Sequence, residues 1–395
     1  MTKRLLPLIL SLAMLPALAS CGSEERAAPP APLSKAALAA VIEKPGINRE
    51  KLARSVDALF LDEAAGETRA LLVFSGGRII AERYGAGYNR NTRLIGWSMS
   101  KTITGVLIGM LVSDGRLRLD EGVPVPAWQR PGDPRGAITL RQLLQMRSGL
   151  RHTEAGDPVY DSSEVRMLFL DGRDNMAAWA EEQPLEAEPG KVWKYSSATT
   201  VILADIAARV LTESTDPKVR RQAVSDYLHA RLFEVAGMKS MVPEFDAAGT
   251  LIGSSLIHGT ARDWGKFGEF LRAGGAVKGA QLVPHGWIEF MTSPSPRNPG
   301  YGGQLWLNRP QVDGHDVLFP TRGPSSLFAC TDHLGQYVLV SPEQGLTVVR
   351  LGKSSEKERG RVREHLADIV GLFSKLQKLK LPSTTVTQPP PSQAR

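Results

Sequence analysis

The pattern of apolar and polar positions near the start of the chain predicts a helix followed by a β-hairpin. Apolar residues recur with a helical period in residues 49–64. The uninterrupted apolar run at 70–74 then predicts a buried strand. Two glycines in the turn at 75–77 favour a tight hairpin, whose second strand we expect at 78–84.

The end of the chain repeats this kind of pattern. Residues 325–331, 336–341 and 346–351 are apolar runs of strand length, and the polar turn 342–345 separates the last two. A helical pattern follows at 356–379. Strands are therefore expected near both ends of the chain.

The segment between the two sets of strands, residues 96–310, shows mostly helical patterns separated by Gly and Pro loops. The simplest arrangement is an α+β fold. In it, one antiparallel sheet is built from both chain ends and flanked by the terminal helices, with a mainly helical subdomain inserted. We expect one domain at 46–380, with its sheet part at about 46–95 and 310–380 and its helical part at about 96–309. A cleft between the two parts is the natural place for a site.

The first residues predict export. Residues 1–20 have a basic start and an apolar core of signal-peptide length. The residues leading to Cys21 resemble a bacterial lipobox, which implies cleavage before Cys21 and a membrane anchor on its lipidated thiol; an ordinary signal peptide with an incidental cysteine is the alternative. By resemblance to the enterobacterial sorting rule, Gly22 after the cysteine favours the outer over the inner membrane, on the periplasmic side. We expect 21–45 to be a flexible tether and 381–395 a disordered tail.

Composition excludes several classes of protein. The 395 residues carry a formal net charge of +7 without any run of five basic residues, so nucleic acid is not an expected partner. The two cysteines exclude a disulfide framework and a Cys-rich zinc module. The seven histidines lack metal-ligand spacing, and no nucleotide-binding glycine motif is present, so we expect no metal and no cofactor. The absence of Gly-x-Ser-x-Gly argues against an α/β-hydrolase.

One predicted helix carries a candidate nucleophile and a candidate base. Residues 98–113 have the apolar spacing of a core-facing helix, and Ser98 and Lys101 share one face of its first turn. A neutral lysine amine could take the proton of the serine hydroxyl, and the helix N-terminus would favour an anion there. A second Ser-x-x-Lys, Ser354 to Lys357, lacks an apolar helix behind it and is interpreted as solvated surface.

The surroundings of this pair resemble a known superfamily. Residues 96–102, Gly-Trp-Ser-Met-Ser-Lys-Thr, are similar to the first motif of the serine β-lactamases and penicillin-binding proteins, and residues 138–150 are similar to one of its structural helices. The resemblance covers most of 50–375 and is strongest to the branch of class C β-lactamases, family VIII-type esterases and 6-aminohexanoate-dimer hydrolases. It implies that Ser98 forms an acyl-enzyme and that Lys101 helps to move its proton.

The second motif of the superfamily, Tyr-x-Asn, is partly present. Tyr195 follows the usual lead-in, and the resemblance implies that its hydroxyl shuttles protons together with Lys101. Ser197 stands where the family has asparagine. This departure puts in doubt the hydrogen bonds that the asparagine gives to substrate and lysine.

The third motif, Lys-Thr-Gly in β-lactamases, is expected near the last strands. His333-Leu334-Gly335 resembles the His-x-Gly variant of the esterase and amide-hydrolase branch. This implies that His333 contacts substrate and that Gly335 lets substrate approach the strand. It also implies that the backbone N–H of Gln336 joins that of Ser98 in an oxyanion hole.

A loop and a later segment are more similar to the aminohexanoate-oligomer hydrolases than to the β-lactamases. The loop at 158–165 resembles one whose tyrosine closes over substrate, which would assign Tyr160 that role. Residues 249–255 and 260–264 together resemble a segment typical of that group.

The sequence thus predicts a lipid-anchored serine hydrolase that cleaves an ester or small amide. A β-lactamase or D,D-peptidase is the alternative within the same chemistry. A catalytically inactive binding lipoprotein is the alternative from another class.

Overall fold

The computed structural model describes residues 32–377. The signal peptide expected at 1–20, the lipidation site Cys21 and the tail expected at 381–395 lie outside the described residues. Within the described part of the chain, no helix combines the length and apolar character that crossing a membrane requires.

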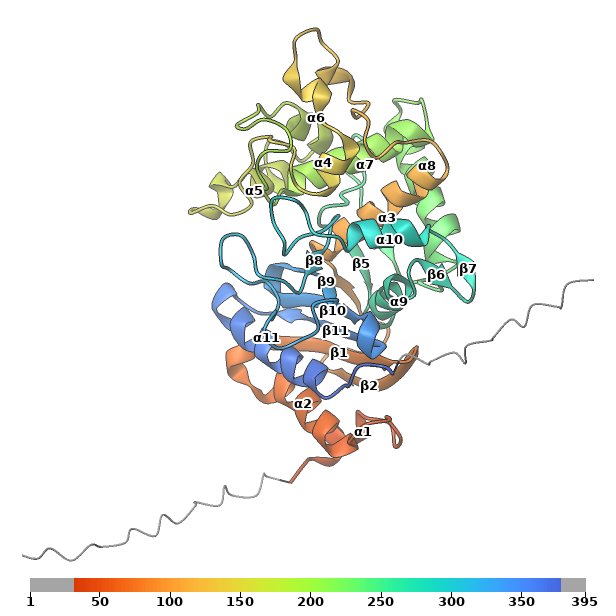
Figure 1. Ribbon diagram of the computed structural model, residues 1–395, viewed down its shortest axis with the longest axis vertical. Coiled ribbons are helices and arrows are strands. Elements are labelled where there is room, and N and C mark those ends of the chain that lie inside the picture. Colours follow the sequence, from red (N-terminus) through yellow and green to blue (C-terminus); the bar gives the residue numbers. More distant parts are fainter. Residues whose placement is uncertain (1–31, 378–395) are drawn as a thin grey trace, which may run out of the picture.

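A six-stranded sheet is the centre of the fold, and its neighbouring strands are all antiparallel. Its order is β2-β1-β11-β10-β9-β8, so strands from both chain ends lie side by side (Figure 1). This confirms the expected α+β sheet. The strands are β1 (Glu67–Ser75), β2 (Arg78–Tyr84), β8 (Trp306–Leu307), β9 (Phe328–Asp332), β10 (Gln336–Ser341) and β11 (Leu346–Lys353).

The pairing of β1 with β11 joins the two ends of the chain, with Leu72 opposite Val349 and Val73 opposite Val348. Alternate side chains on each strand point to opposite faces, so each face buries its own apolar cluster. One face packs on α2 (Arg49–Leu61) and α11 (Glu356–Gly371), and the other packs on α9 (Ala261–Arg272). Each fully buried valine or leucine stabilises this layer by about 1.5–3 kcal/mol.

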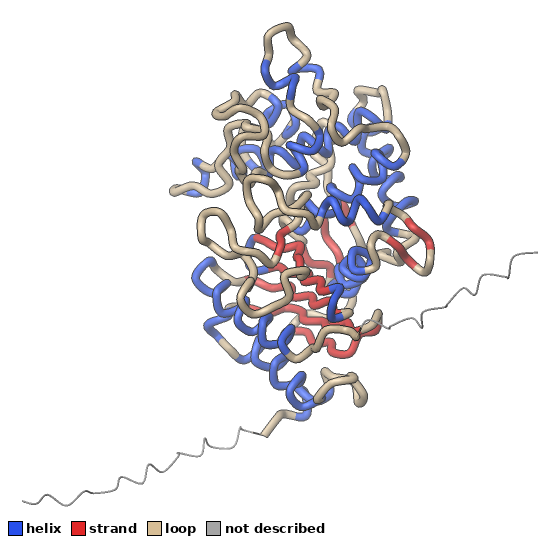
Figure 2. The backbone as a smooth tube through the Cα atoms, viewed as in Figure 1, coloured by secondary structure: helices blue, strands red, loops and turns tan. Residues whose placement is uncertain are grey.

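The helical part lies beside the sheet, and helices and long loops make up most of it (Figure 2). Its central helix is α3 (Met99–Ser113), which is buried from Met99 to Leu111 and packs on α7 and β9. Helices α4, α5, α6 and α8 pack on α7, and Trp287 of α10 donates a hydrogen bond to the Gly105 carbonyl of α3. Their bounds are α4 (Leu140–Leu144), α5 (Ser163–Phe169), α6 (Met176–Glu181), α7 (Ser197–Leu211), α8 (Pro217–Leu228) and α10 (His285–Met291).

The chain also forms two small sheets of short strands besides the six-stranded sheet. A three-stranded sheet has the order β3-β5-β4, and a separate hairpin pairs β6 with β7. These strands are β3 (Arg93–Ile95), β4 (Val242–Pro243), β5 (Ile257–Thr260), β6 (Ala276–Val277) and β7 (Ala280–Gln281). Because β3 leads directly into the start of α3, this small sheet fixes where that helix begins.

Two boundaries differ from the expectations. The tether expected at 21–45 folds in its last part: α1 is Lys35–Ala39, and buried Val41 forms a bridge with Ala81. The Arg49 side chain holds this segment by donating to backbone carbonyls of Leu38 and Val41.

The last helix was expected at 356–379, but α11 ends at Gly371. The side-chain amide of Gln344 donates to the carbonyls of Val370 and Phe373. The Leu376 N–H bonds the carbonyl of Glu343 in the β10–β11 turn. These contacts with the turn replace continued helical hydrogen bonds.

Candidate active site

Ser98 and Lys101 lie together at the start of α3. Ser98 is the residue that precedes the helix, and Trp97 before it has a positive φ of 47°. The Lys101 Nζ donates to the Ser98 Oγ at 2.9 Å, and both residues are buried, with Ser98 5% and Lys101 1% exposed. The hydroxyl therefore lies at the N-terminus of a 15-residue helix, where backbone N–H groups favour negative charge.

Three groups from other segments surround the Lys101 ammonium. It donates to the Ser197 Oγ at 2.8 Å and to the Ser254 carbonyl at 3.1 Å. It also lies 4.9 Å from the centre of the Tyr195 ring. Ser197 is the first residue of α7, whose start is fixed because the Ser196 side chain accepts from the Thr199 N–H. Two helix N-termini thus meet at this lysine.

Glu154 is part of this cluster, although nothing in the sequence singled it out. Its Oε1 accepts from the Ser197 hydroxyl at 2.5 Å and lies 3.7 Å from the Lys101 Nζ. Its Oε2 accepts from the Ser197 N–H at 2.9 Å and lies 2.6 Å from the His152 Nε2. Burial alone would raise the Glu154 pKa, but the charge of Lys101 and the His152 and Ser197 hydrogen bonds lower that pKa to about 2. Glu154 is therefore an anion at neutral pH.

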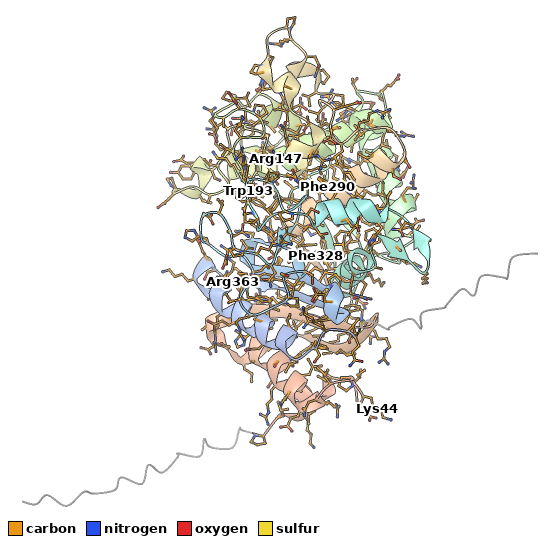
Figure 3. All side chains as sticks on the ribbon, in the orientation of Figure 1. Lys44, Arg147, Trp193, Phe290, Phe328 and Arg363 are labelled. Carbon is orange, nitrogen blue, oxygen red and sulfur yellow. The ribbon has the colours of Figure 1, made fainter. Side chains whose placement is uncertain are left out.

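Tyr195 is half-buried in a group of aromatic rings. Its ring centre lies 5.1 Å from that of Trp306 and 5.8 Å from that of Tyr301. The neighbouring Trp193 packs on the same two rings. In Figure 3, Trp193 lies at the lower margin of the helical part, and Phe328 lies in the sheet below it. Tyr195 is thus held where the two parts meet, with its ring face toward Lys101.

His333 faces the same site from the sheet. It is exposed, and its ring makes an edge contact with Trp97 at 5.1 Å between centres. Both line a cavity of about 310 Å³, together with Glu154, Glu164 and Val159. The Ser197 hydroxyl also lies 3.2 Å from the Glu164 Oε1. The cavity therefore borders Trp97 and Glu154, which adjoin the Ser98–Lys101 pair, and three glutamates and one arginine line it: Glu154, Glu164, Glu356 and Arg359.

Tyr160 lies in a loop that borders this cavity. Its side chain is 58% exposed in the single turn Val159–Asp161, and the lining residue from that turn is Val159. Its assignment as a substrate contact stays a prediction.

Gly335 and Gln336 have structural roles that the sequence did not indicate. Gly335 has a φ of +75°, and a Cβ there would lie 2.8 Å from the buried Arg350 Nη1. The Gln336 side chain donates to the Gly352 carbonyl at 2.6 Å and accepts from the Gly352 N–H. The glycine is therefore needed for packing against Arg350, and its expected role in letting substrate approach the strand stays a prediction. The oxyanion role of the Gln336 N–H stays a prediction.

The second Ser-x-x-Lys differs from its sequence-based interpretation. Ser354, interpreted as solvated surface, is 1% exposed. Its hydroxyl accepts from Arg350 and donates to the Ala65 carbonyl. Ser354 therefore has a structural role, because it links Arg350 of β11 to the backbone at Ala65. Within residues 32–377, no group of three or more His, Cys, Asp or Glu side chains is placed to hold a metal ion.

The sheet built from both chain ends, the helical part beside it and the buried serine–lysine pair define a chain of the β-lactamase and penicillin-binding-protein type. The chain belongs to the beta-lactamase family, whose model matches residues 59–372. The resemblance found in the sequence is thus confirmed.

Relatives of the chain fall in the branch that the sequence indicated. A 6-aminohexanoate-dimer hydrolase of Paenarthrobacter ureafaciens is 28% identical over an alignment of 239 residues, and the match covers 56% of this chain and 56% of the relative. The match thus spans little more than half of that relative's length.

Solved structures share the fold. One from Bacillus anthracis, described as a 6-aminohexanoate-dimer hydrolase, matches with a TM-score of 0.63 and 22% identity over 80% of this chain and 81% of its own. A family VIII carboxylesterase matches with a TM-score of 0.60 and 16% identity over 81% and 97%.

Proposed function

We propose that this protein is a serine hydrolase that cleaves an ester or small amide bond through an acyl-enzyme. The observation that carries the proposal is the buried hydrogen bond between the Lys101 Nζ and the Ser98 Oγ at the N-terminus of α3. A hydroxyl held by an amine in this place is the arrangement that an activated serine needs. Attack of the Ser98 Oγ on a carbonyl would transfer its proton toward Lys101 and Tyr195, and water would then release the acyl group.

The cavity beside the pair supports a small substrate. About 310 Å³ accommodates a short acyl chain, and Val159, Val165 and Leu168 give it apolar walls. Three glutamates and one arginine line the cavity, so acidic groups outnumber basic ones in the lining. This excess of negative charge supports a neutral ester or an amide with an amino group over an anionic β-lactam. The name of the Paenarthrobacter relative, a 6-aminohexanoate-dimer hydrolase, points the same way.

A panel of three substrates tests this proposal. We would follow hydrolysis of p-nitrophenyl butyrate, a linear aminohexanoate amide and nitrocefin by the chain from residue 22. Ser98→Ala is the blank, and Ser113→Ala at the exposed far end of α3 is the matched control. We expect turnover of ester or amide that Ser98→Ala abolishes and Ser113→Ala retains. Faster turnover of nitrocefin than of the ester and the amide would indicate a β-lactamase. A folded chain that hydrolyses none of the three would favour a binding protein.

We also propose that the protein is anchored by lipid on Cys21, on the periplasmic side of the outer membrane. The lipobox-like residues before Cys21 support this proposal. Metabolic labelling with an alkyne fatty acid should mark the wild-type chain in membranes and leave Cys21→Ala unlabelled. Equal labelling of both would contradict it.

A further inference from the structure

One segment of the helical part forms an apolar wall of the cavity, and this wall continues onto the molecular surface. Four apolar side chains of the segment line the cavity of about 310 Å³: Val159, Val165, Leu168 and Phe169. Val159 is also 64% exposed and Phe169 45% exposed. Residues 159–170 carry four of the twelve large apolar side chains that are exposed in the described part of the chain. Apolar surface concentrated in this way beside a cavity indicates a binding surface.

The apolar wall lies close to the nucleophile. Trp97, which directly precedes Ser98, lines the same cavity. Glu154 lines it too, and its Oε1 lies 3.7 Å from the Lys101 Nζ. That Nζ donates to the Ser98 Oγ at 2.9 Å. A group attached to Ser98 therefore has the cavity within its reach.

Two of the three glutamates in the lining lie near a cation of the protein. Glu154 lies beside Lys101, and the Glu356 Oε1 lies 3.9 Å from the Arg359 Nη2. These pairs leave the apolar wall as the surface that an uncharged chain would contact. The excess of carboxylates disfavours a chain that ends in a carboxylate. A chain that ends in an ammonium group would lose hydration against the apolar wall.

Tyr195 indicates which half of the substrate lies in this cavity. Its ring packs on Trp306, which lines a second cavity of about 600 Å³. As the Ser98 Oγ bonds to the carbonyl carbon, the bond from that carbon to the leaving oxygen breaks. The leaving oxygen takes up the proton that Ser98 gave to Lys101 and Tyr195, so the leaving group lies on the Tyr195 side. The acyl group stays on Ser98 and extends toward Trp97.

We propose that the cavity and the apolar segment 159–170 bind the acyl chain, and that the substrate is an ester of an uncharged, medium-chain fatty acid. This inference rests on the proposed function and selects the neutral ester among its substrates. At about 30 Å³ for each water molecule, the cavity holds roughly ten groups of the size of a water or a methylene. A butyryl group would fill less than half of it, and an octanoyl group would fill most of it.

The dependence of kcat/KM on acyl-chain length tests the proposal. We would compare p-nitrophenyl butyrate with p-nitrophenyl octanoate, at concentrations where neither ester aggregates, using the chain from residue 22. Each fully buried methylene raises kcat/KM by about 4-fold. Because the wall is partly open to solvent, we expect octanoate to exceed butyrate by about 10-fold or more. An equal or lower value for octanoate would overturn the proposal.

A charged chain end gives an independent comparison. The p-nitrophenyl esters of hexanoate and 6-aminohexanoate have acyl chains of the same length and differ in the terminal ammonium group. We expect kcat/KM for hexanoate to be on the order of 10-fold higher. A preference for 6-aminohexanoate would show that the glutamates bind the ammonium group, and it would overturn the uncharged chain.

Substitutions in the wall connect this preference to the proposed residues. Val159→Ser and Phe169→Ser remove apolar surface, and both residues lie outside the two buried apolar clusters, so the fold should be kept. We expect each to lower the ratio of octanoate to butyrate kcat/KM by about 3–10-fold. Val219→Ser is the matched control, because Val219 is also 45% exposed and lies on α8, outside the lining. An unchanged ratio in both wall variants, or an equal loss in the control, would contradict the assignment.

Two further outcomes separate the possible failures. Octyl and ethyl butyrate place the difference in chain length on the leaving group, and a larger preference there than in the acyl series would overturn the acyl assignment. Butyrate turnover that needs Ser98 but shows no preference for longer chains would leave the proposed function intact and refute this inference. A folded chain that hydrolyses none of these esters would instead contradict the proposed function.

Discussion

At the scale of single residues, the Ser98–Lys101 pair could be predicted from the sequence, and the neighbouring carboxylate of Glu154 could not. Ser98 and Lys101 lie within one helical turn, so spacing alone places them together. Glu154 lies 43 residues before Ser197 in a loop without periodicity, and a lone glutamate there is indistinguishable from a solvated one. Only tertiary packing shows that it faces the lysine.

Tyr195 provides a test at this scale. Tyr195→Phe keeps the ring that packs on Trp306 and Lys101 but removes the hydroxyl. If this hydroxyl carries a proton to the leaving group, kcat should fall about 10²–10⁴-fold with little change in KM. Steady-state kinetics with an amide substrate would measure it. Tyr227→Phe on α8, remote from the site, should change neither constant.

Gly335 provides a second test. Its φ of +75° and the 2.8 Å approach to Arg350 predict that Gly335→Ala lowers the free energy of unfolding by about 2–4 kcal/mol. Gly345 also has a positive φ, but a Cβ there would lie 3.2 Å from a flexible leucine side chain. We therefore expect Gly345→Ala to lower the free energy of unfolding by only about 1–2 kcal/mol. Denaturant unfolding compares the two, and equal losses would show that contact with Arg350 does not matter.

At the scale of elements, buried charges fix how strands and helices meet. Arg350 on β11 donates to the carbonyls of Leu334 and Gly335 and to Ser354. It thereby fixes the β9–β10 turn that carries His333. The sequence indicated the strands on either side of this turn, but an arginine inside an apolar strand gave no sign of its partners.

A carboxylate pair between α6 and α7 predicts a pH-dependent stability. Burial, together with the charge of Asp205, raises the pKa of Glu181 to about 8. The folded state therefore keeps a proton that the unfolded chain releases near pH 4.5. Stability should fall between about pH 5 and pH 8, by at most about 1.4 kcal/mol per pH unit.

Glu181→Gln removes this titration. Because glutamine occupies the same volume and cannot ionise, the variant should lose less stability than wild type as the pH rises through this window. Thermal unfolding at about pH 5, 6.5 and 8 would measure the difference. Parallel curves for the two proteins would contradict the raised pKa.

At the scale of the whole molecule, the sheet closes the chain on itself. Apolar runs at both ends indicated the strands, and alternation of their side chains set the β1–β11 register. The folded segment around α1 and the early end of α11 could not be predicted, because side-chain bonds from Arg49 and Gln344 decide them. The cavity escaped prediction for a related reason, since loops from distant segments line it.

The central claim is that Lys101 activates Ser98. The most direct measurement is labelling of the chain by a fluorophosphonate, read by intact mass and peptide mapping. We expect one adduct per chain on the peptide that contains Ser98, no adduct in Ser98→Ala, and much slower labelling in Lys101→Ala. A folded wild-type chain that remains unlabelled, or that is labelled at another residue, would contradict it.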